Sequence, residues 1–380
     1  MPSQLLLSLP KSSQAGINSS LWEGCFNGRE SSIHQLAPYV GKLKSGMARV
    51  LIEEFSQEGD IVLDPFCGSG VVPYEALLAR RHSIGNDLSP YAYVLTKGKL
   101  TAPKTEREAI ARAEACVFEA GRISIGMETI PDWVKAFFHP KTLQETATLA
   151  TVLKRRNEYF LLSCLLGILH HVRPGFLSYP ASHLVPYLRA IKYPRDVFPE
   201  MYLYRPVATR LLAKIHRAYR RFEAPETGLQ SQVLEENAAS LSLKKDSVDA
   251  IVSSPPYYGA LDYGRDNRLR LWFLGVPDYK KLEVKLTSND RVYIPEMTRA
   301  VGEMLRVLKP GKSAALILGD YNKNGHTRDS GAALIKIVHD NFGALATAEK
   351  VLVDEVPDDR RTRRLTRTTK QESLVLIRKL

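Results

Sequence analysis

Short apolar runs alternate with amphipathic stretches in the first hundred residues and again after residue 230. The apolar runs are bounded by turn-forming residues and predict buried strands at 61–64, 82–87, 232–234, 248–253 and 313–320. Helical periodicity lies between them at 45–55, 71–80 and 291–308. Strands separated by helices are typical of an α/β fold with a largely parallel sheet.

This alternation stops between residues 101 and 230, where helical patterns follow one another at 105–120, 140–155, 159–171 and 204–222. We therefore expect a mainly helical insertion at 101–230. The core would be formed by 31–100 and 231–380, after a loosely held N-terminal arm at 1–30. Two last apolar runs, 351–356 and 372–378, predict an antiparallel hairpin that closes the sheet.

Composition narrows the class of partner. The chain has 380 residues, 44% of them hydrophobic and 25% charged, which is typical of a globular protein. Its net charge of +12 favours a polyanionic partner. The four cysteines (Cys25, Cys67, Cys116 and Cys164) show neither zinc nor disulfide spacing, so we expect no metal and a reducing compartment. No signal peptide or apolar run of membrane-spanning length is recognisable, which predicts a cytoplasmic protein.

The strand at 61–64 leads into a glycine-rich turn. Asp64 to Gly70 reads Asp-Pro-Phe-Cys-Gly-Ser-Gly, and a helix follows. Strand, glycine turn and helix form a nucleotide-type pocket at the carboxyl edge of an open sheet, where Gly68 and Gly70 would let the backbone approach a ligand. Neither a dinucleotide fingerprint nor a triphosphate loop is present. Asp87 ends the next strand, where a carboxylate can hold ribose hydroxyls.

A second candidate site follows the strand at 248–253, where the sequence reads Ser254-Pro255-Pro256-Tyr257. The two prolines fix the loop and remove two backbone donors, which leaves a rigid set of acceptors. Tyr257 adds a flat ring. Such a site suits a planar heterocycle with an exocyclic amine, although the same four residues alone are also typical of an ordinary turn.

Together the two stretches resemble the motifs of the S-adenosylmethionine-dependent DNA amino-methyltransferases. In that family the catalytic motif has the form (Asp/Asn/Ser)-Pro-Pro-(Tyr/Phe/Trp). The resemblance implies a Rossmann-like class I fold with a mixed seven-stranded sheet, S-adenosylmethionine as cofactor, and Ser254, Pro255, Pro256 and Tyr257 as catalytic residues. The cofactor residues that it implies are Tyr39, Asp64, Phe66, Cys67, Gly68, Gly70, Asp87, Asn237 and Ala238. Asn237-Ala238 departs from the family's usual Asp-Ala.

The insertion is the candidate target-recognition domain. Between residues 171 and 221 it has ten Lys or Arg and two acids, with six interleaved tyrosines, a composition typical of nucleic-acid surfaces. The connection at 360–370 carries six basic residues. Candidate DNA contacts are Arg205, Arg217, Arg265, Arg268, Arg361 and Arg364. Some of these basic side chains are equally explained as solvated helix faces or a charged turn.

The resemblance implies a double-stranded DNA substrate with a flipped target base, in a prokaryotic or phage context with a possible cognate restriction endonuclease. Serine at position 254 favours the N4 amine of cytosine, and N6-adenine remains an alternative. Methylation at cytosine C5 is excluded because the chain has no Pro-Cys nucleophile. An RNA amino-methyltransferase, a small-molecule methyltransferase and a non-catalytic nucleic-acid-binding protein also remain open.

Overall fold

The structure is a computed structural model of the chain. It describes residue 25 and residues 30–171, 176–182, 187–256, 263–283, 292–323, 326–355 and 371–380. The expected hairpin connection, with Arg361 and Arg364, lies outside these ranges, and so does Tyr257.

The core is a seven-stranded mixed sheet in the order β3-β2-β1-β4-β5-β9-β8. Its strands are β1 (Ile61–Asp64), β2 (His82–Asn86), β3 (Ser231–Leu234), β4 (Val248–Ser253), β5 (Leu308–Gly319), β8 (Ala346–Glu355) and β9 (Gln371–Lys379). The first five are parallel, and β9 runs antiparallel to both of its neighbours. The predicted Rossmann-like fold with a closing hairpin is therefore confirmed.

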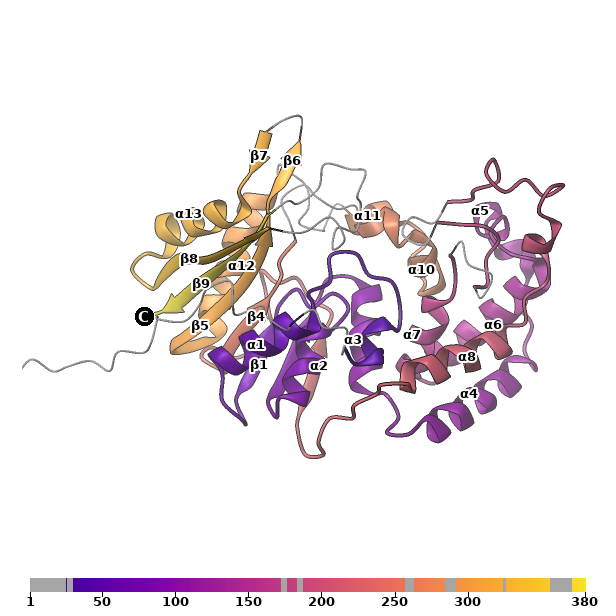
Figure 1. Cartoon of the computed structure of the whole chain (residues 1–380), viewed down its shortest axis with the longest axis horizontal. Helices are drawn as coiled ribbons and strands as arrows, with labels where there is room; N and C mark the ends of the chain where they lie inside the picture. Colours follow the sequence, from indigo (N-terminus) through magenta and orange to yellow (C-terminus); the bar gives the residue numbers. More distant parts are fainter. Residues whose placement is uncertain are drawn as a thin grey trace, which may run out of the picture.

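Helices cover both faces of this sheet (Figure 1). Helices α1 (Ser45–Phe55) and α2 (Val71–Leu78) pack on the face that carries Val62, Val252 and Ala315. Helices α12 (Tyr293–Val307) and α13 (Ser330–Phe342) pack on the face that carries Leu63, Ile251 and Ala314. Neighbouring residues of one strand thus point to opposite helical layers, which explains why these strands are apolar throughout.

The insertion forms the opposite end of the molecule from β8 and β9 (Figure 1). Its helices are α4 (Glu106–Ala120), α5 (Asp132–Lys135), α6 (Pro140–Arg155), α7 (Tyr159–Gly167) and α8 (Val207–Tyr219), with 3₁₀ turns at Met127–Thr129 and Pro199–Tyr202. The Thr105 side chain caps α4 by accepting from the Glu108 amide at 3.2 Å. The helices predicted at 159–171 and 204–222 were too long, because α7 ends at Gly167 and α8 runs only from Val207 to Tyr219.

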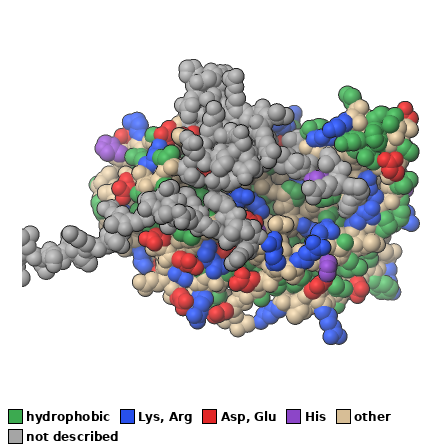
Figure 2. Space-filling view, in the orientation of Figure 1, with side chains coloured by type: hydrophobic (Ala, Val, Ile, Leu, Met, Phe, Trp, Pro, Cys, Tyr) green, Lys and Arg blue, Asp and Glu red, His purple; other side chains and the backbone are tan. Residues whose placement is uncertain are grey.

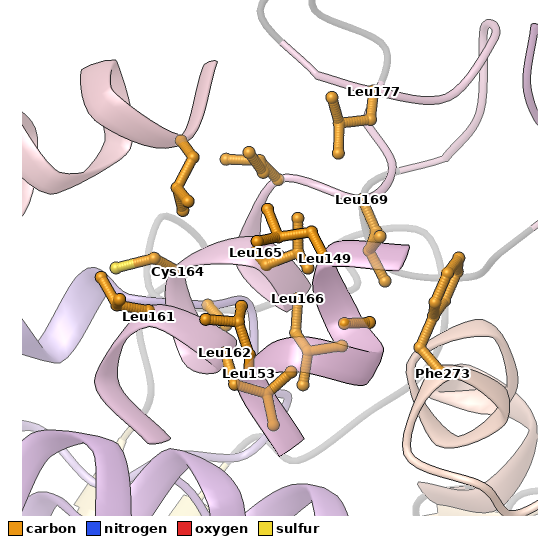
Figure 3. Packing of buried hydrophobic residues seen from close by; sticks show 14 of the residues in the cluster. Leu149, Leu153, Leu161, Leu162, Cys164, Leu165, Leu166, Leu169, Leu177 and Phe273 are labelled. Atoms are coloured by element: carbon orange, nitrogen blue, oxygen red, sulfur yellow. The ribbon is translucent and has the colours of Figure 1, made fainter. Parts of the chain in front are cut away.

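One hydrophobic cluster joins the insertion to the core. It contains Leu149 and Leu153 of α6 and Phe273 of α10 (Arg268–Phe273), together with five residues of α7: Leu161, Leu162, Cys164, Leu165 and Leu166 (Figure 3). It also contains Tyr91, Val94 and Leu95 of α3 (Pro90–Leu100), the helix that follows β2. Helix α3 belongs to the α/β core, so the insertion and the α/β core are joined through this one hydrophobic cluster.

The remaining elements are short. Helices α9 (Tyr263–Asp266), α10 (Arg268–Phe273) and α11 (Tyr279–Glu283) follow the candidate catalytic motif, and a 3₁₀ turn at Ser32–Gln35 precedes α1. The sequence did not predict the small hairpin of β6 (Tyr321–Lys323) and β7 (His326–Arg328). Strand β5 begins at Leu308, earlier than expected, because a register shift carries the chain past Gly311, whose φ is +74°.

Candidate cofactor and catalytic site

Strands β1, β2, β3 and β4 end at the same edge of the sheet, and the segments that follow them line one cavity. Parallel strands bring their carboxyl ends together, so residues far apart in the sequence meet there. The cavity is lined by eight of the nine predicted cofactor residues: Tyr39, Asp64, Phe66, Cys67, Gly68, Asp87, Asn237 and Ala238. Ser254 and Pro256 of the predicted catalytic motif line it as well. Tyr263, Lys42 and Ser69 also line it and were not predicted.

The ninth predicted residue, Gly70, is not part of the cavity lining and has a different structural role. It has φ +71° at the N-cap of α2, and a Cβ there would lie 2.6 Å from the Oγ1 atom of Thr96 on α3. Gly68 has φ +50°, and a Cβ there would lie 2.8 Å from Cε1 of Tyr39. Gly70 therefore allows two helices to pack, whereas Gly68 lets the cavity tyrosine approach the turn.

Asp87 is fixed at the end of β2 by two backbone amides. One carboxylate oxygen accepts from the Gly68 amide and the other from the Ser89 amide, each at 2.9 Å. Burial raises the pKa of Asp87 to about 6, and these hydrogen bonds oppose the rise. The carboxylate thus lies in the cavity in a fixed orientation, with lone pairs left for a ligand.

The fully buried amide of Asn86 joins the loops on either side of Asp87. Its nitrogen donates to the carbonyls of Pro65 and Glu236, both at 3.1 Å, and its oxygen accepts from the Glu236 amide. This side chain therefore sets the distance between the glycine turn and the loop that carries Asn237. Nothing in the linear sequence distinguishes Asn86 from a surface asparagine.

Asp64 connects the glycine turn to the candidate catalytic motif. The hydroxyl of Ser253, the last residue of β4, donates to Asp64 Oδ1 at 2.6 Å, and the Phe66 amide donates to the same oxygen at 3.1 Å. Burial raises the pKa of Asp64 to about 7, against the effect of both hydrogen bonds. Since Ser254 follows directly, this bond fixes the acid and the motif relative to each other.

A column of tyrosines closes one side of the cavity. Tyr39 stacks on Tyr91 with ring centroids 5.9 Å apart and lies 6.3 Å from the ring of Tyr263. The Tyr91 hydroxyl donates to the Pro38 carbonyl at 2.8 Å. Behind the column, the buried guanidinium of Arg270 lies 5.4 Å from the Tyr91 ring and donates to the Leu166 carbonyl of α7. The column thus links the cavity to the insertion.

A buried charged network holds the segment that carries Tyr39. His34 Nε2 lies 2.7 Å from Glu75, which also accepts from Arg49 at 2.9 Å, and the Lys99 amine lies 3.3 Å from His34 Nδ1. Burial lowers the pKa of His34 to about 4, so the ring is neutral at pH 7, with Nε2 donating to Glu75 and Nδ1 accepting from Lys99. These contacts fix residues 32–42 against α1, α2 and α3.

The predicted DNA contacts do not form one group. The side chain of Arg205 is buried, with 7% of the residue exposed, and donates to the Met201 carbonyl at 2.6 Å, so its burial does not support a phosphate contact. Arg217 is exposed on α8. The side chain of Arg265 is half exposed and 4.0 Å from Asp266, and Arg268 lies 5.4 Å above the Trp133 ring. Arg361 and Arg364 lie outside the described residues.

The described residues contain neither a candidate metal site nor a membrane-spanning helix. Within these ranges, His, Cys, Asp and Glu side chains form no group of three that could bind a metal ion. None of the helices described is both long enough and apolar enough to span a bilayer.

The chemistry of the cavity fits S-adenosylmethionine. Asp64 provides a buried carboxylate and Asp87 a partly buried one, which suit a cationic ligand with ribose hydroxyls. The Ser69 hydroxyl is buried in the turn and makes no hydrogen bond. The Lys42 amine, which donates to the His34 carbonyl at 3.0 Å, retains donors for a carboxylate. The cofactor predicted from the sequence thus agrees with the residues that line the cavity.

The chain also resembles known methyltransferases. Residues 13–97 match a family described as "DNA methylase" of the N6/N4 type. The Type II methyltransferase M.BsoBI of Geobacillus stearothermophilus is 23% identical over 282 residues, which cover 68% of this chain and 55% of that protein. The Type II methyltransferase M.MjaII of Methanocaldococcus jannaschii is 32% identical over 72 residues, which cover 19% of this chain and 14% of that protein.

The chain therefore spans about half of the first relative and a smaller part of the second. A solved SAM-dependent methyltransferase from Methanosarcina mazei is 13% identical, with a TM-score of 0.33 over 86% of this chain and 96% of that one. The family match over residues 13–97 includes the glycine turn at 64–70. The chain therefore resembles the S-adenosylmethionine-dependent DNA methylases of the N6/N4 type.

Proposed function

We propose that this protein is a DNA methyltransferase that transfers the methyl group of S-adenosylmethionine to the exocyclic N4 amine of cytosine. The observation that carries the proposal is that Ser254 and Pro256 line the same cavity as the glycine turn. A Ser253–Asp64 hydrogen bond of 2.6 Å joins the two motifs behind that cavity. Methyl transfer requires the cofactor and the target amine to lie next to each other, and the two motifs lie next to each other in this way.

The Ser-Pro-Pro-Tyr motif would bind the target amine through hydrogen-bond acceptors. The bound cofactor supplies an electrophilic methyl group. The Ser254 hydroxyl and the Pro255 carbonyl would accept hydrogen bonds from the amine, which favours a tetrahedral nitrogen and offsets its developing positive charge. Positioning of the amine would supply most of the remaining rate enhancement. Tyr257 would stack on the extruded base, at roughly 1–3 kcal/mol.

The proposed target base is cytosine. Serine at the first position of the motif supports N4-cytosine by resemblance, and the family also includes enzymes that modify N6 of adenine. We further propose that the substrate is a duplex with the base flipped out, because the amine of a stacked base cannot reach an enclosed site. Residues 101–230 would recognise the target, and a cognate restriction endonuclease would complete the system.

The test is transfer of tritiated methyl from S-adenosylmethionine to unmethylated genomic DNA and, in parallel, to total RNA. Digestion to nucleosides and mass spectrometry then identify the product. N4-methylcytosine in DNA is expected. N6-methyladenine would overturn the choice of base, and label in RNA alone would overturn the DNA assignment. Cofactor binding without transfer to either would favour a non-catalytic nucleic-acid-binding protein.

The Ser254→Ala variant tests the role of the motif. Loss of one positioned hydrogen-bonding group is expected to lower kcat by about 10²–10³ with little change in cofactor affinity. Ser83→Ala is the matched control, because Ser83 is buried in strand β2 of the same sheet and its hydroxyl has no hydrogen-bond partner among the described residues. Equal activity of the two variants would remove Ser254 from the mechanism.

A further inference from the structure

Two groups of surface cations on the insertion differ in their partners. In the first group each cation is paired with a carboxylate. Arg112 lies 2.6 Å from Glu108 and 3.6 Å from Glu158. Arg155 and Arg156 both contact Glu119, the latter at 2.9 Å. Paired cations of this kind stabilise a helical surface and offer little net charge to a ligand.

The second group, which we call the cation–tyrosine strip, consists of Lys141, Arg189, Lys192 and Arg195 with the rings beneath them. These cations lie 4.5, 5.8, 5.6 and 5.7 Å from the rings of Tyr204, Tyr187, Tyr193 and Tyr202, respectively. None of the four forms an ion pair with a carboxylate in the part of the chain that the structure describes. The acids of the same segment, Asp196 and Glu200, are exposed. The positive charge of the strip is therefore not neutralised.

Contacts below the strip hold the rings of Tyr202 and Tyr204 in place. The Tyr202 hydroxyl donates to the Tyr193 carbonyl at 2.6 Å, and its ring packs on Tyr179 at 4.8 Å. The Tyr204 hydroxyl donates to Glu145 of α6, whose other oxygen accepts from the Val207 amide of α8 at 3.0 Å. Lys141 and Arg195 thus lie over anchored rings, so that ordering these two cations on a ligand costs less entropy.

Apolar side chains project from the same segment. Ile191 is fully exposed, and Val197 and Leu203 are each 61% exposed. In Figure 2, hydrophobic side chains gather over the insertion, at the end far from β8 and β9, with lysine and arginine beside them. Proteins that bind DNA grooves combine phosphate-binding cations with apolar side chains of this kind.

We propose that the cation–tyrosine strip is a DNA-binding surface in which the four cations contact phosphates and Ile191 enters a groove. This proposal rests on the proposed function, in which the substrate is DNA. The strip lies at the end of the insertion away from β8 and β9 (Figure 1). It would therefore bind the duplex beside the target base and take no part in holding the flipped base itself.

Charge argues for a polyanion over a second copy of the chain. In a two-fold interface the same patch meets itself, which would bring four unneutralised cations against four others. Phosphates, spaced along both strands of a duplex, complement such a row. The family match of the chain to DNA methylases favours DNA over RNA.

The experiment measures the salt dependence of DNA binding by the full chain. Fluorescence anisotropy with a labelled random-sequence duplex gives Kd over a range of salt concentrations. The variant Arg189→Gln/Lys192→Gln/Arg195→Gln is expected to lower the slope of log Kd against log salt by about 2.7, since each phosphate contact contributes roughly 0.9. Between 50 and 200 mM salt, the wild type should therefore lose about 40-fold more affinity than the variant.

The matched control removes three charges from the first group, as Arg112→Gln/Arg155→Gln/Arg156→Gln, and should retain the wild-type slope. Equal slopes for the two variants would overturn the proposal, and so would an effect of the strip variant on an RNA duplex alone. Ile191→Ser should weaken binding without a change in slope, whereas Val197→Ser should do so less. A wild-type chain that binds and methylates no DNA would instead overturn the proposed function.

Discussion

At the cofactor cavity backbone amides hold two carboxylates, one buried and one partly buried, whereas at the cation–tyrosine strip four cations lie at the surface over aromatic rings. The difference follows from the ligand that each region is proposed to bind. A small cation is held best by acids that are already oriented in a site of low dielectric constant. A long polyanion requires cations that exchange water and counterions for phosphates, so neutralisation by local carboxylates would weaken binding.

The largest effect is expected when the fixed acid of the cavity loses its charge. In the wild type the Asp87 carboxylate accepts from the Gly68 and Ser89 amides. Asp87→Asn keeps one of these acceptor oxygens and replaces the other with an NH₂ group, which faces an amide donor. We expect cofactor affinity to fall on the order of 100-fold, which calorimetry with S-adenosylmethionine would measure. Asp329→Asn, at the N-cap of α13, is the control and should leave affinity unchanged. Similar affinities for both variants would remove Asp87 from the cofactor site.

The two glycines of the turn separate packing from binding. In Gly70→Ala the new methyl group would contact Thr96, so we expect the free energy of unfolding to fall by about 2 kcal/mol. In Gly68→Ala the methyl group would displace Tyr39, so cofactor affinity should fall more than stability. Denaturant unfolding and calorimetry on both variants measure the contrast. A larger loss of stability in Gly68→Ala and a larger loss of cofactor affinity in Gly70→Ala would contradict these two roles.

The Ser253–Asp64 bond predicts a pH dependence. Asp64, with a pKa of about 7, is protonated below that pH and ionised above it, and a cationic cofactor favours the ionised form. Affinity should therefore fall as pH drops through 7. Ser253→Ala removes a hydrogen bond to the carboxylate, so the pKa rises further, and affinity at pH 7 should drop on the order of tenfold and recover at higher pH. An unchanged pH profile in Ser253→Ala would contradict this role.

The smallest effect concerns Arg205, which the sequence placed among the DNA contacts. Its guanidinium donates to the Met201 carbonyl within the insertion. Arg205→Gln should therefore lower the free energy of unfolding by about 1 kcal/mol and leave the salt slope of DNA binding unchanged. Arg220→Gln, at the exposed end of α8, should change stability little. A reduced salt slope for Arg205→Gln would restore it to the DNA surface.

The sequence predicted the parts that depend on local pattern. Apolar runs bounded by turns identified the strands that end at the cavity, and the glycine turn and the Ser-Pro-Pro stretch identified two of its walls. Local capping is of the same kind: Asp329 is the N-cap of α13, and its side chain accepts from the Ala332 amide at 2.8 Å. These features are set by neighbours in the chain.

The missing parts depend on tertiary contacts. Asn86, Ser253 and Tyr263 acquire their roles from residues more than a hundred positions away, or from strands that meet only in the sheet. Basic composition identified the insertion but could not separate buried Arg205 from Arg189, since both lie in the same positive stretch. Tyr257 and the connection at 360–370 remain predictions.

The shared hydrophobic cluster of α3, α6, α7 and α10 limits how this architecture can be recombined. Removing residues 101–230 would expose the apolar face of α3, so the remaining core would aggregate before it lost its sheet. An insertion grafted from a relative would have to carry side chains that pack against Tyr91, Val94 and Leu95 of α3. If residues 101–230 recognise the target, as we propose, exchange of target specificity between such enzymes would require substitutions on the outer surface of the insertion, because its buried face must keep its packing against α3.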